Sequence, residues 1–224
     1  MTLAPESTGA SKATAAPGVV EITSPEELRE LLGAPMRRAI DKERVTLHAW
    51  DREWLARSPF CLIATSDAEG ACDVSPKGDP PGFAHVLDDT TIAIPDRPGN
   101  RRADGFMNVL SNPHVGLIFF VPRRAETLRI NGRARLVREA PFFDDMVVKG
   151  HRPSLALVVD IEQIFFHCAK ALMRSKLWKP EEWAEDTLPS QARIVKAVQY
   201  TEESLEELER HYDGAVYEKK LYRG

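Results

Sequence analysis

The sequence predicts a mainly β, α+β fold, in which an antiparallel sheet curls into a small barrel and carries helices at both ends. Six or seven short apolar runs, separated by turn residues, follow one another between residues 60 and 168. Most of the connections between them are short, and short connections join antiparallel strands. We expect the sheet to close on itself, because closure removes open edges that promote aggregation.

The residues before the barrel divide into two segments. Residues 1–20 are rich in Ala, Ser, Thr, Pro and Gly and lack the pattern of a signal peptide, so we expect a mobile leader. Residues 21–57 are expected to be helical. Ser24 is a candidate cap for a helix that begins at Pro25 and stops at Gly33, and helical character then continues to Pro59.

Hairpins account for the first part of the barrel. Two short runs around Ala68-Glu69-Gly70 predict a hairpin over residues 60–78. Residues 83–96 repeat the pattern, with Asp88-Asp89 as the reversal, and a strand follows over 114–122. In "TLRINGRARLV", Asn131-Gly132 is the strongest hairpin signal in the chain.

The remaining residues predict a helix, a strand and a helical tail. "EAPFFDDMVVKG" is expected to be helical, and "SLALVVDIEQIFFHC" to be a long strand. The last 55 or so residues become polar and helical, in "AKALMRSKLW", "SQARIVKAV" and "SLEELERHYDG". We therefore expect a barrel domain over 58–178 and a C-terminal helical extension over 179–224.

Composition excludes several classes of protein. The formal net charge is -4, which gives no overall attraction to nucleic acid or to an anionic membrane. No apolar run approaches the length of a membrane span. Three cysteines without C-x-x-C spacing fit reduced thiols, so we expect a cytoplasmic protein.

Positive charge is concentrated at one turn. "PDRPGNRRADGFMNVLSNP", residues 95–113, places Arg97, Arg101 and Arg102 within six positions. Asn100 is a candidate cap for a helix over 101–111, and a helix N-terminus flanked by two guanidinium groups is suited to bind phosphate. The alternative is an ordinary surface helix whose arginines pair with nearby acids.

The order of these elements resembles the FMN-binding split-barrel family of pyridoxamine 5'-phosphate oxidase. The likeness covers roughly residues 58–178 and depends on "SPKG", "IPD", "GNRRADGF", "SNPHVGL" and "RING". The tail "FFHCAKALMRSKLW" is similar to that of an uncharacterised subfamily of probable FMN-dependent enzymes. The resemblance implies an antiparallel split β-barrel with peripheral helices, and FMN as cofactor.

The resemblance also implies a set of cofactor-binding residues. Phosphate would be bound at the Asn-Arg-Arg turn, the ribityl chain near Pro-Asp, and the flavin ring near "SPKG". In the related family the C-terminal segment of the second subunit closes the site, which implies a homodimer with FMN at the subunit interface. The predicted residues are Ser75, Lys77, Gly78, Pro95, Asp96, Asn100, Arg101, Arg102, Thr127, Lys170 and Arg174.

Two departures from the family pattern limit what the resemblance implies. Thr127 stands where the oxidase has a Gln that contacts the flavin. The oxidase also binds its substrate with a C-terminal R-x-H arrangement, whereas this chain ends "YEKKLYRG". The resemblance therefore supports the fold and FMN, but not the vitamin B6 reaction.

Other candidate chemistry in the sequence is weaker. His167 and Cys168 are adjacent and lack a second spaced pair of ligands, so no metal site is predicted. Adjacent strand residues point to opposite faces, which also opposes a Cys–His catalytic pair.

The predicted function is an FMN-dependent oxidoreductase that acts on a small organic substrate or NAD(P)H. A non-catalytic flavin or haem store and a deazaflavin-dependent reductase on the same fold are the alternatives. If the protein binds haem, His85, His114 and His167 are the candidate ligands.

Overall fold

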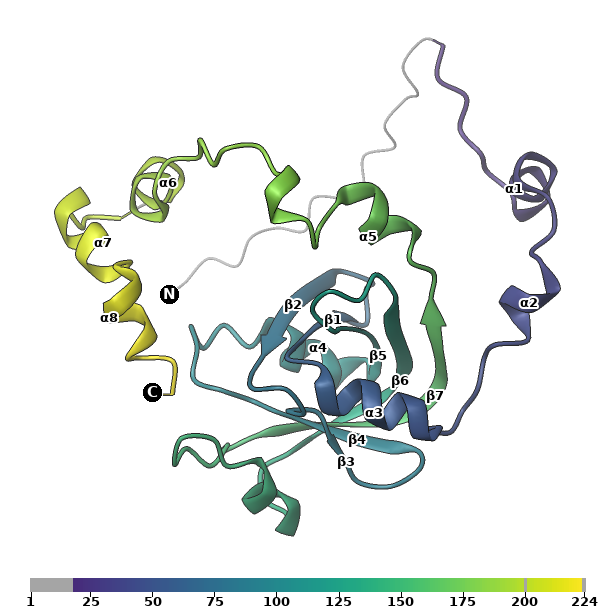
Figure 1. The fold of residues 1–224 in the computed structure, drawn as a ribbon, viewed down its shortest axis with the longest axis horizontal. Helices are drawn as coiled ribbons and strands as arrows, with labels where there is room; N and C mark the ends of the chain where they lie inside the picture. The colour runs from purple at the N-terminus through teal and green to yellow at the C-terminus, as the bar shows by residue number, and fades with distance from the viewer. Residues whose placement is uncertain (1–17, 200, 223–224) are drawn as a thin grey trace. The chain divides into compact units, whose positions relative to one another are not determined.

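The computed structural model describes residues 18–199 and 201–222, shown as a ribbon in Figure 1. The described residues divide after Asp41 into two compact units, and most of the leader expected over 1–20 lies outside the described residues. In the first unit, α1 (Pro25–Leu32) has the predicted ends: the Ser24 hydroxyl accepts the Glu27 amide at 3.1 Å, and Gly33 follows with φ of +75°. A short helix, α2 (Arg37–Ile40), comes next.

The prediction of continuous helix up to Pro59 is wrong. Between α2 and α3 (Ala49–Arg57), Arg44 bonds to Ile164 through both of its backbone groups, at 3.1 and 2.7 Å. This pairing takes the backbone out of helical geometry, since the same amide and carbonyl cannot also bond within a helix. The fully buried Asp51 then forms a capping box with His48 at the start of α3. Its carboxylate also accepts hydrogen bonds from the guanidinium group of Arg44.

Seven antiparallel strands form one sheet in the order β2-β1-β5-β6-β7-β4-β3. The predicted hairpins β1–β2 and β3–β4 and the predicted long strand β7 are confirmed. The strands are β1 (Phe60–Ser66), β2 (Cys72–Gly78), β3 (His85–Val86), β4 (Thr91–Pro95), β5 (His114–Phe120), β6 (Thr127–Val137) and β7 (Ala156–His167).

The predicted closure of the sheet is not complete. The order of hydrogen-bonded strands runs from β2 at one edge to β3 at the other, and these two strands do not pair within the described ranges. β3 contains only two residues, so it offers little backbone for a further ladder. The architecture is that of a curled antiparallel sheet with a split, as expected for a split barrel.

The hairpin predicted at Asn131-Gly132 is also wrong. β6 runs without reversal from Thr127 to Val137, and its register with β7 shifts between Asn131 and Gly132. This is a β-bulge, which inserts an extra residue and bends the strand. Glycine is required there for space, because a Cβ on Gly132 would lie 2.1 Å from the Asp160 carbonyl oxygen.

The hydrophobic core lies inside the curled sheet, against α3 and α4 (Asp104–Ser111). Phe119, Leu117, Leu128, Ile130 and Ile164 are fully buried there. The segment expected to be helical after β6 is a 3₁₀ helix, η1 (Pro141–Met146).

The helical character predicted for the tail is confirmed. Its elements are α5 (Lys170–Ser175), η2 (Pro180–Glu182), α6 (Gln191–Val198), α7 (Leu205–His211) and α8 (Gly214–Glu218). α6 and α7 bury a small cluster of their own, made of Ala192, Val195 and Leu208. None of the described helices has the length and apolar character needed to cross a membrane.

Candidate functional site

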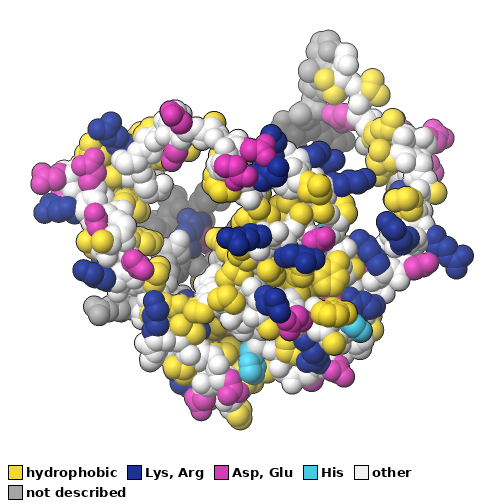
Figure 2. Space-filling model, viewed as in Figure 1, with side chains coloured by type: hydrophobic (Ala, Val, Ile, Leu, Met, Phe, Trp, Pro, Cys, Tyr) yellow, Lys and Arg dark blue, Asp and Glu magenta, His cyan; other side chains and the backbone are white. Residues whose placement is uncertain are grey.

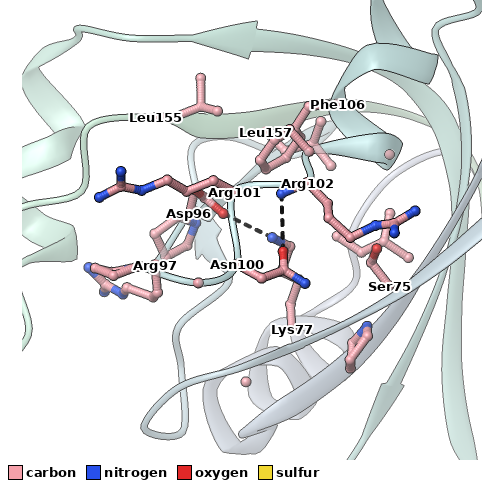
Figure 3. A pocket seen from close by; sticks show the side chains of 18 of the residues that line it. Ser75, Lys77, Asp96, Arg97, Asn100, Arg101, Arg102, Phe106, Leu155 and Leu157 are labelled. Carbon is pink, nitrogen blue, oxygen red and sulfur yellow. Dashed lines mark hydrogen bonds and ion pairs between the residues drawn. The ribbon is translucent and has the colours of Figure 1, made fainter. Parts of the chain in front are cut away.

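A cavity of about 1090 Å³ lies where β2, the end of β4 and the start of α4 meet. The sequence placed candidate residues on each of these three segments, and the fold brings them together (Figure 3). Eight of the eleven predicted residues line the cavity: Ser75, Lys77, Gly78, Pro95, Asp96, Asn100, Arg101 and Arg102.

β2 supplies one wall through simple strand alternation. Asp73, Ser75 and Lys77 are half-buried and line the cavity, whereas Val74 is exposed and does not line it. The Ser75 hydroxyl donates to Asp73 Oδ2 at 2.8 Å. This wall is therefore polar, with a carboxylate at one end and an ammonium group at the other.

Lys77 is held in place by two neighbours. Its Nζ donates to Asp96 Oδ1 at 2.9 Å and lies 4.7 Å from the centroid of the Phe106 ring. The Lys77 and Asp96 side chains are 24% and 29% exposed, so the pair is partly shielded from water. An ammonium group fixed in this way can donate a further hydrogen bond to a ligand without first becoming ordered.

The arginine turn has a strained backbone. Arg101 and Ala103 both have φ near +60°, and the Arg102 amide donates to Asn100 Oδ1 at 3.1 Å. α4 begins at Asp104, after Ala103, so the prediction that Asn100 caps this helix is wrong: its side chain closes the turn instead. Consequently the Arg101 and Arg102 side chains leave the turn in opposite directions (Figure 3).

Arg97 is largely buried and makes hydrogen bonds to the body of the protein, unlike Arg101 and Arg102. Its Nε donates to Asp79 Oδ2 at 2.5 Å, and its terminal nitrogens donate to the carbonyls of Met146 (2.7 Å) and His151 (3.4 Å). The Arg97 and Asp79 side chains are 12% and 1% exposed. Arg97 therefore ties the start of the turn to the body of the protein and is not free to bind phosphate.

The charges that line the cavity nearly cancel. Asp73, Asp79, Asp96 and Asp104 face four cations, and three ion pairs form: Lys77–Asp96, Arg97–Asp79 and Arg102–Asp104. The hydrogen bond that the Arg102 guanidinium donates to the Asp104 carboxylate raises the pKa of Arg102 above its usual range. Within the described part of the chain, Arg101 is the lining cation without an ion pair. It is thus the cation most available to an anionic ligand.

The N-terminus of α4 already faces a carboxylate. A Cβ on Gly105 would lie 3.0 Å from Asp73 Oδ2 and 3.4 Å from the Thr65 hydroxyl, so Asp73 packs against the first turn of this helix. The negative charge of Asp73 interacts favourably with the positive end of the helix dipole, at the position where the sequence predicts a phosphate. Phosphate binding would therefore depend on Arg101 and the amides of the preceding turn.

Three predicted residues do not line the cavity. Thr127 is buried in β6 opposite His167, which removes it from the space that a ligand could enter. Lys170 and Arg174 are exposed on α5. From their own chain they do not reach the cavity, so a role at the cofactor requires the partner subunit, as the resemblance implies.

Sequence reasoning missed many of the lining residues, and six of them matter for the argument below. Strand alternation could have identified Asp73, since it shares a face with Ser75 and Lys77. The others come from the end of β2, the first turn of α4, the loop at residue 151 and the C-terminal tail, where no local pattern points to the cavity. They are Asp79, Phe106, His151, Tyr217 and Leu221.

Two further titratable groups lie outside the cavity lining. Burial raises the pKa of the Cys61 thiol to about 12, so Cys61 is protonated and unsuited to act as a nucleophile. Burial, together with the nearby charges of Arg129 and Lys42, holds the pKa of His167 below its usual value. His167 is therefore neutral around pH 7.

Comparison with known proteins identifies a family. The family model described as pyridoxamine 5'-phosphate oxidase matches residues 47–168, more than half of the chain. No curated protein matches the chain.

Solved structures of other proteins are similar to part of the chain at low identity. HupZ of Group A Streptococcus is 18% identical, with 54% of this chain and 93% of that chain covered and a TM-score of 0.44. HutZ of Vibrio cholerae, described as a haem storage protein, is 16% identical, with 53% and 93% covered and a TM-score of 0.37. A general stress protein 26 relative from Clostridium acetobutylicum is 13% identical, with 51% and 83% covered and a TM-score of 0.39.

Proposed function

The chain belongs to the pyridoxamine 5'-phosphate oxidase family, and from this premise we propose that it is a flavoprotein that binds FMN in the cavity. The proposed activity is hydride transfer between FMN and a small organic substrate or NAD(P)H. The observation that carries the proposal is the convergence of eight predicted cofactor-binding residues around one cavity. Its volume, about 1090 Å³, is slightly above the usual range of about 300–1,000 Å³ for ligand and cofactor sites.

The lining residues fit FMN with one role each. Arg101 and the amides of its turn would bind the phosphate, and Pro95 and Asp96 would line the path of the ribityl chain. Lys77 would donate toward the N1–O2 edge of the ring, where negative charge develops on reduction. When bound, FMN supplies the hydride chemistry, and the protein orients the ring and adjusts its electronics.

The charge balance of the cavity favours FMN over a deazaflavin cofactor. Three of the four lining cations are already paired with carboxylates. A longer and more acidic cofactor would need additional free cations, whereas one phosphate can be bound by Arg101 and backbone amides.

The proposed homodimer is supported by an exposed apolar face on β2, β1 and β5. Val74 lies opposite Ala64, and Leu62 lies between Pro76 and Ile118, so these side chains share one face of the sheet. Val74 is 60% exposed. Figure 2 shows that hydrophobic side chains are also exposed elsewhere over the barrel, among scattered charges. Because the opposite face of β2 lines the cavity, a second copy packed on this apolar face would lie beside the cofactor.

A charge on the apolar face tests the dimer. Val74→Asp should convert the protein from dimer to monomer in sedimentation and weaken FMN retention, because an unpaired carboxylate would be buried at the interface. Leu188→Asp, at a loop residue that is 77% exposed, is the matched control and should leave the dimer intact. A wild-type protein that sediments as a monomer would exclude the dimer.

The flavin itself is tested on the freshly purified protein. We expect visible absorbance of a bound flavin, and the mass of FMN in the material that heat releases. Steady oxidation of NADH by the holoprotein, with an added electron acceptor, would establish turnover. Protein that stays colourless after incubation with excess FMN contradicts the proposal.

A haem-binding function is a second candidate, because a histidine lines the cavity. That histidine is His151, and none of the three histidines expected from the sequence does so. His85 lies 3.7 Å from Asp145, His114 bonds to Asn112, and His167 contacts Arg129. If haem binds, His151→Ala should abolish the Soret band and His114→Ala should not.

A further inference from the structure

The C-terminal tail reaches the cofactor cavity. α8 and the residues after it extend beyond the part of the chain that the family model matches, which ends at residue 168. Tyr217 and Leu221 nevertheless line the cavity, together with the arginine turn and β2. Part of the cavity wall is therefore supplied by a segment far from the rest in sequence.

Within the described residues, one side-chain hydrogen bond, made by Tyr222, attaches this segment to the barrel. The Tyr222 hydroxyl donates to Asp79 Oδ1, and Asp79 Oδ2 accepts from Arg97 at 2.5 Å. The Tyr222 ring lies 5.9 Å from the Arg97 guanidinium carbon and 5.3 Å from Lys149 Nζ. The ring thus lies near two cations, while its hydroxyl is bound to a carboxylate that is 1% exposed.

Elsewhere the segment is weakly held. α8 buries none of its residues, and the small cluster in α6 and α7 is separate from the main core. Among the hydrogen bonds and ion pairs of the described residues, Tyr222–Asp79 is the one that joins residues 188–222 to the barrel. A segment with few buried contacts opens locally at low free-energy cost.

The contact is also coupled to the ligand-binding turn. Arg97, which shares Asp79 with Tyr222, begins the turn that continues to Arg101 and Arg102. A change at Tyr222 therefore acts on the carboxylate that positions this turn.

We propose that residues 214–222 form a hinged wall of the cavity, latched by Tyr222 on the Asp79–Arg97 pair, which opens to let the ligand enter and leave. The identity of the ligand rests on the proposed function, whereas the latch does not. With the latch closed, Tyr217 and Leu221 enclose the ligand. With the latch open, the cavity is exposed to water along that side.

The test compares Tyr222→Phe with Tyr212→Phe. Both remove one hydroxyl and keep the ring, and Tyr212 packs against the α6–α7 cluster with no hydrogen bond from its hydroxyl among the described residues. Amide hydrogen exchange of the cofactor-free protein should become about tenfold faster over 214–222 and over 97–102 in Tyr222→Phe, since a hydrogen bond to a charged group is lost. Tyr212→Phe should match the wild type.

A second readout uses the bound flavin. FMN should dissociate about tenfold faster from Tyr222→Phe than from the wild type or Tyr212→Phe, followed by the recovery of flavin fluorescence. If exchange over 214–222 is the same in Tyr222→Phe as in the wild type, Tyr222 does not latch the wall. If exchange is faster but FMN dissociates at the wild-type rate, opening of the wall does not control ligand release. If the wild type binds no flavin, the proposed function fails. The latch is still decided by comparing amide exchange over 97–102 in Tyr222→Phe and in the wild type, because faster exchange in the variant shows that the tail protects this side of the cavity.

Discussion

At the scale of single residues, the same side chain serves different purposes according to its partners. Arg97 is almost buried and tied to Asp79, Arg102 is exposed and paired with Asp104, and Arg101 has no ion pair in the described structure. All three lie within six positions and look equivalent in sequence. Their functions are expected to differ accordingly: Arg97 for stability, and Arg101 more than Arg102 for binding phosphate.

Phosphate recognition should depend mainly on Arg101. In Arg101→Ala the preference for FMN over riboflavin should fall by about tenfold or more, because a charged hydrogen bond to the phosphate is lost. Arg102→Ala should have a smaller effect, since Asp104 already engages that guanidinium. Titration of both flavins by fluorescence quenching measures the ratio, with Arg210→Ala on α7 as the control. A larger loss for Arg102→Ala than for Arg101→Ala contradicts this assignment.

Stability should depend on Arg97. Arg97→Met leaves the buried Asp79 carboxylate without its cation, which should lower the free energy of unfolding by about 3–5 kcal/mol. Urea denaturation measures the change. Arg97→Met combined with Asp79→Asn should recover part of it, because the unpaired charge is then removed. Equal stabilities of the single variant and the wild type would show that the pair is not structural.

At the scale of secondary-structure elements, β6 shows how a local signal is overruled. Asn-Gly strongly favours a two-residue turn, yet β6 continues through it, because pairing with both β5 and β7 satisfies the backbone of the whole strand. The glycine then serves a second purpose, which is to allow the close approach of the Asp160 carbonyl. The bulge bends a central strand, as the curled sheet requires.

Gly132→Ala tests this interpretation of β6. The added methyl group would collide with backbone at 2.1 Å, so the free energy of unfolding should fall by about 2 kcal/mol or more. Gly214→Ala is the matched control: nothing lies within 4 Å of its added Cβ, and alanine is the better helix former. Thermal or urea denaturation distinguishes the two. A tolerated Gly132→Ala would mean that the bulge can shift its register.

At the scale of the whole molecule, the cavity is assembled from segments that no local pattern connects. β2, the arginine turn, the loop at His151 and the C-terminal tail meet around one space. Their polar groups satisfy one another through three ion pairs, which lets charged residues line a partly enclosed site. The tail is the part of this assembly that shares no buried cluster with the main core.

The attachment of the tail should weaken at alkaline pH. Burial and the hydrogen bond to Asp79 raise the pKa of Tyr222 from 10.0 to about 12, while Arg97 opposes the shift and Lys149 and His151 lie against the ring. The protonated phenol is favoured in the folded protein. Its stabilisation is therefore complete below pH 10 and is lost as the pH rises through about 12.

Spectrophotometric titration of tyrosinate measures this shift. The wild type should show a late-titrating component that is missing in Tyr222→Phe. If both proteins titrate identically, Tyr222 is not bound to Asp79 in solution.

A large part of the fold could be predicted from local patterns. The cap at Ser24, the two hairpins, the strand β7 and the tail helices were all correct, because each depends on residues that are close together in the chain. For the candidate site, local patterns led to eight residues that the fold places around one cavity, and their role in binding a cofactor stays a prediction. The errors at Arg44, Asn100 and Asn131-Gly132 occur where a distant strand or a strained turn takes over the backbone's hydrogen bonds.

The sequence by itself determined which segments are strands and helices, because hydrophobic periodicity and turn chemistry act over a few residues. Only the tertiary structure decided which arginine is free, which glycine makes a bulge and which residues close the cavity. These outcomes depend on contacts between residues far apart, such as Tyr222 and Asp79, which are separated by 143 positions. Residues that are distant in sequence determine the charges around a side chain and the space that it can occupy. These surroundings form only when the chain folds, so local sequence patterns do not predict them.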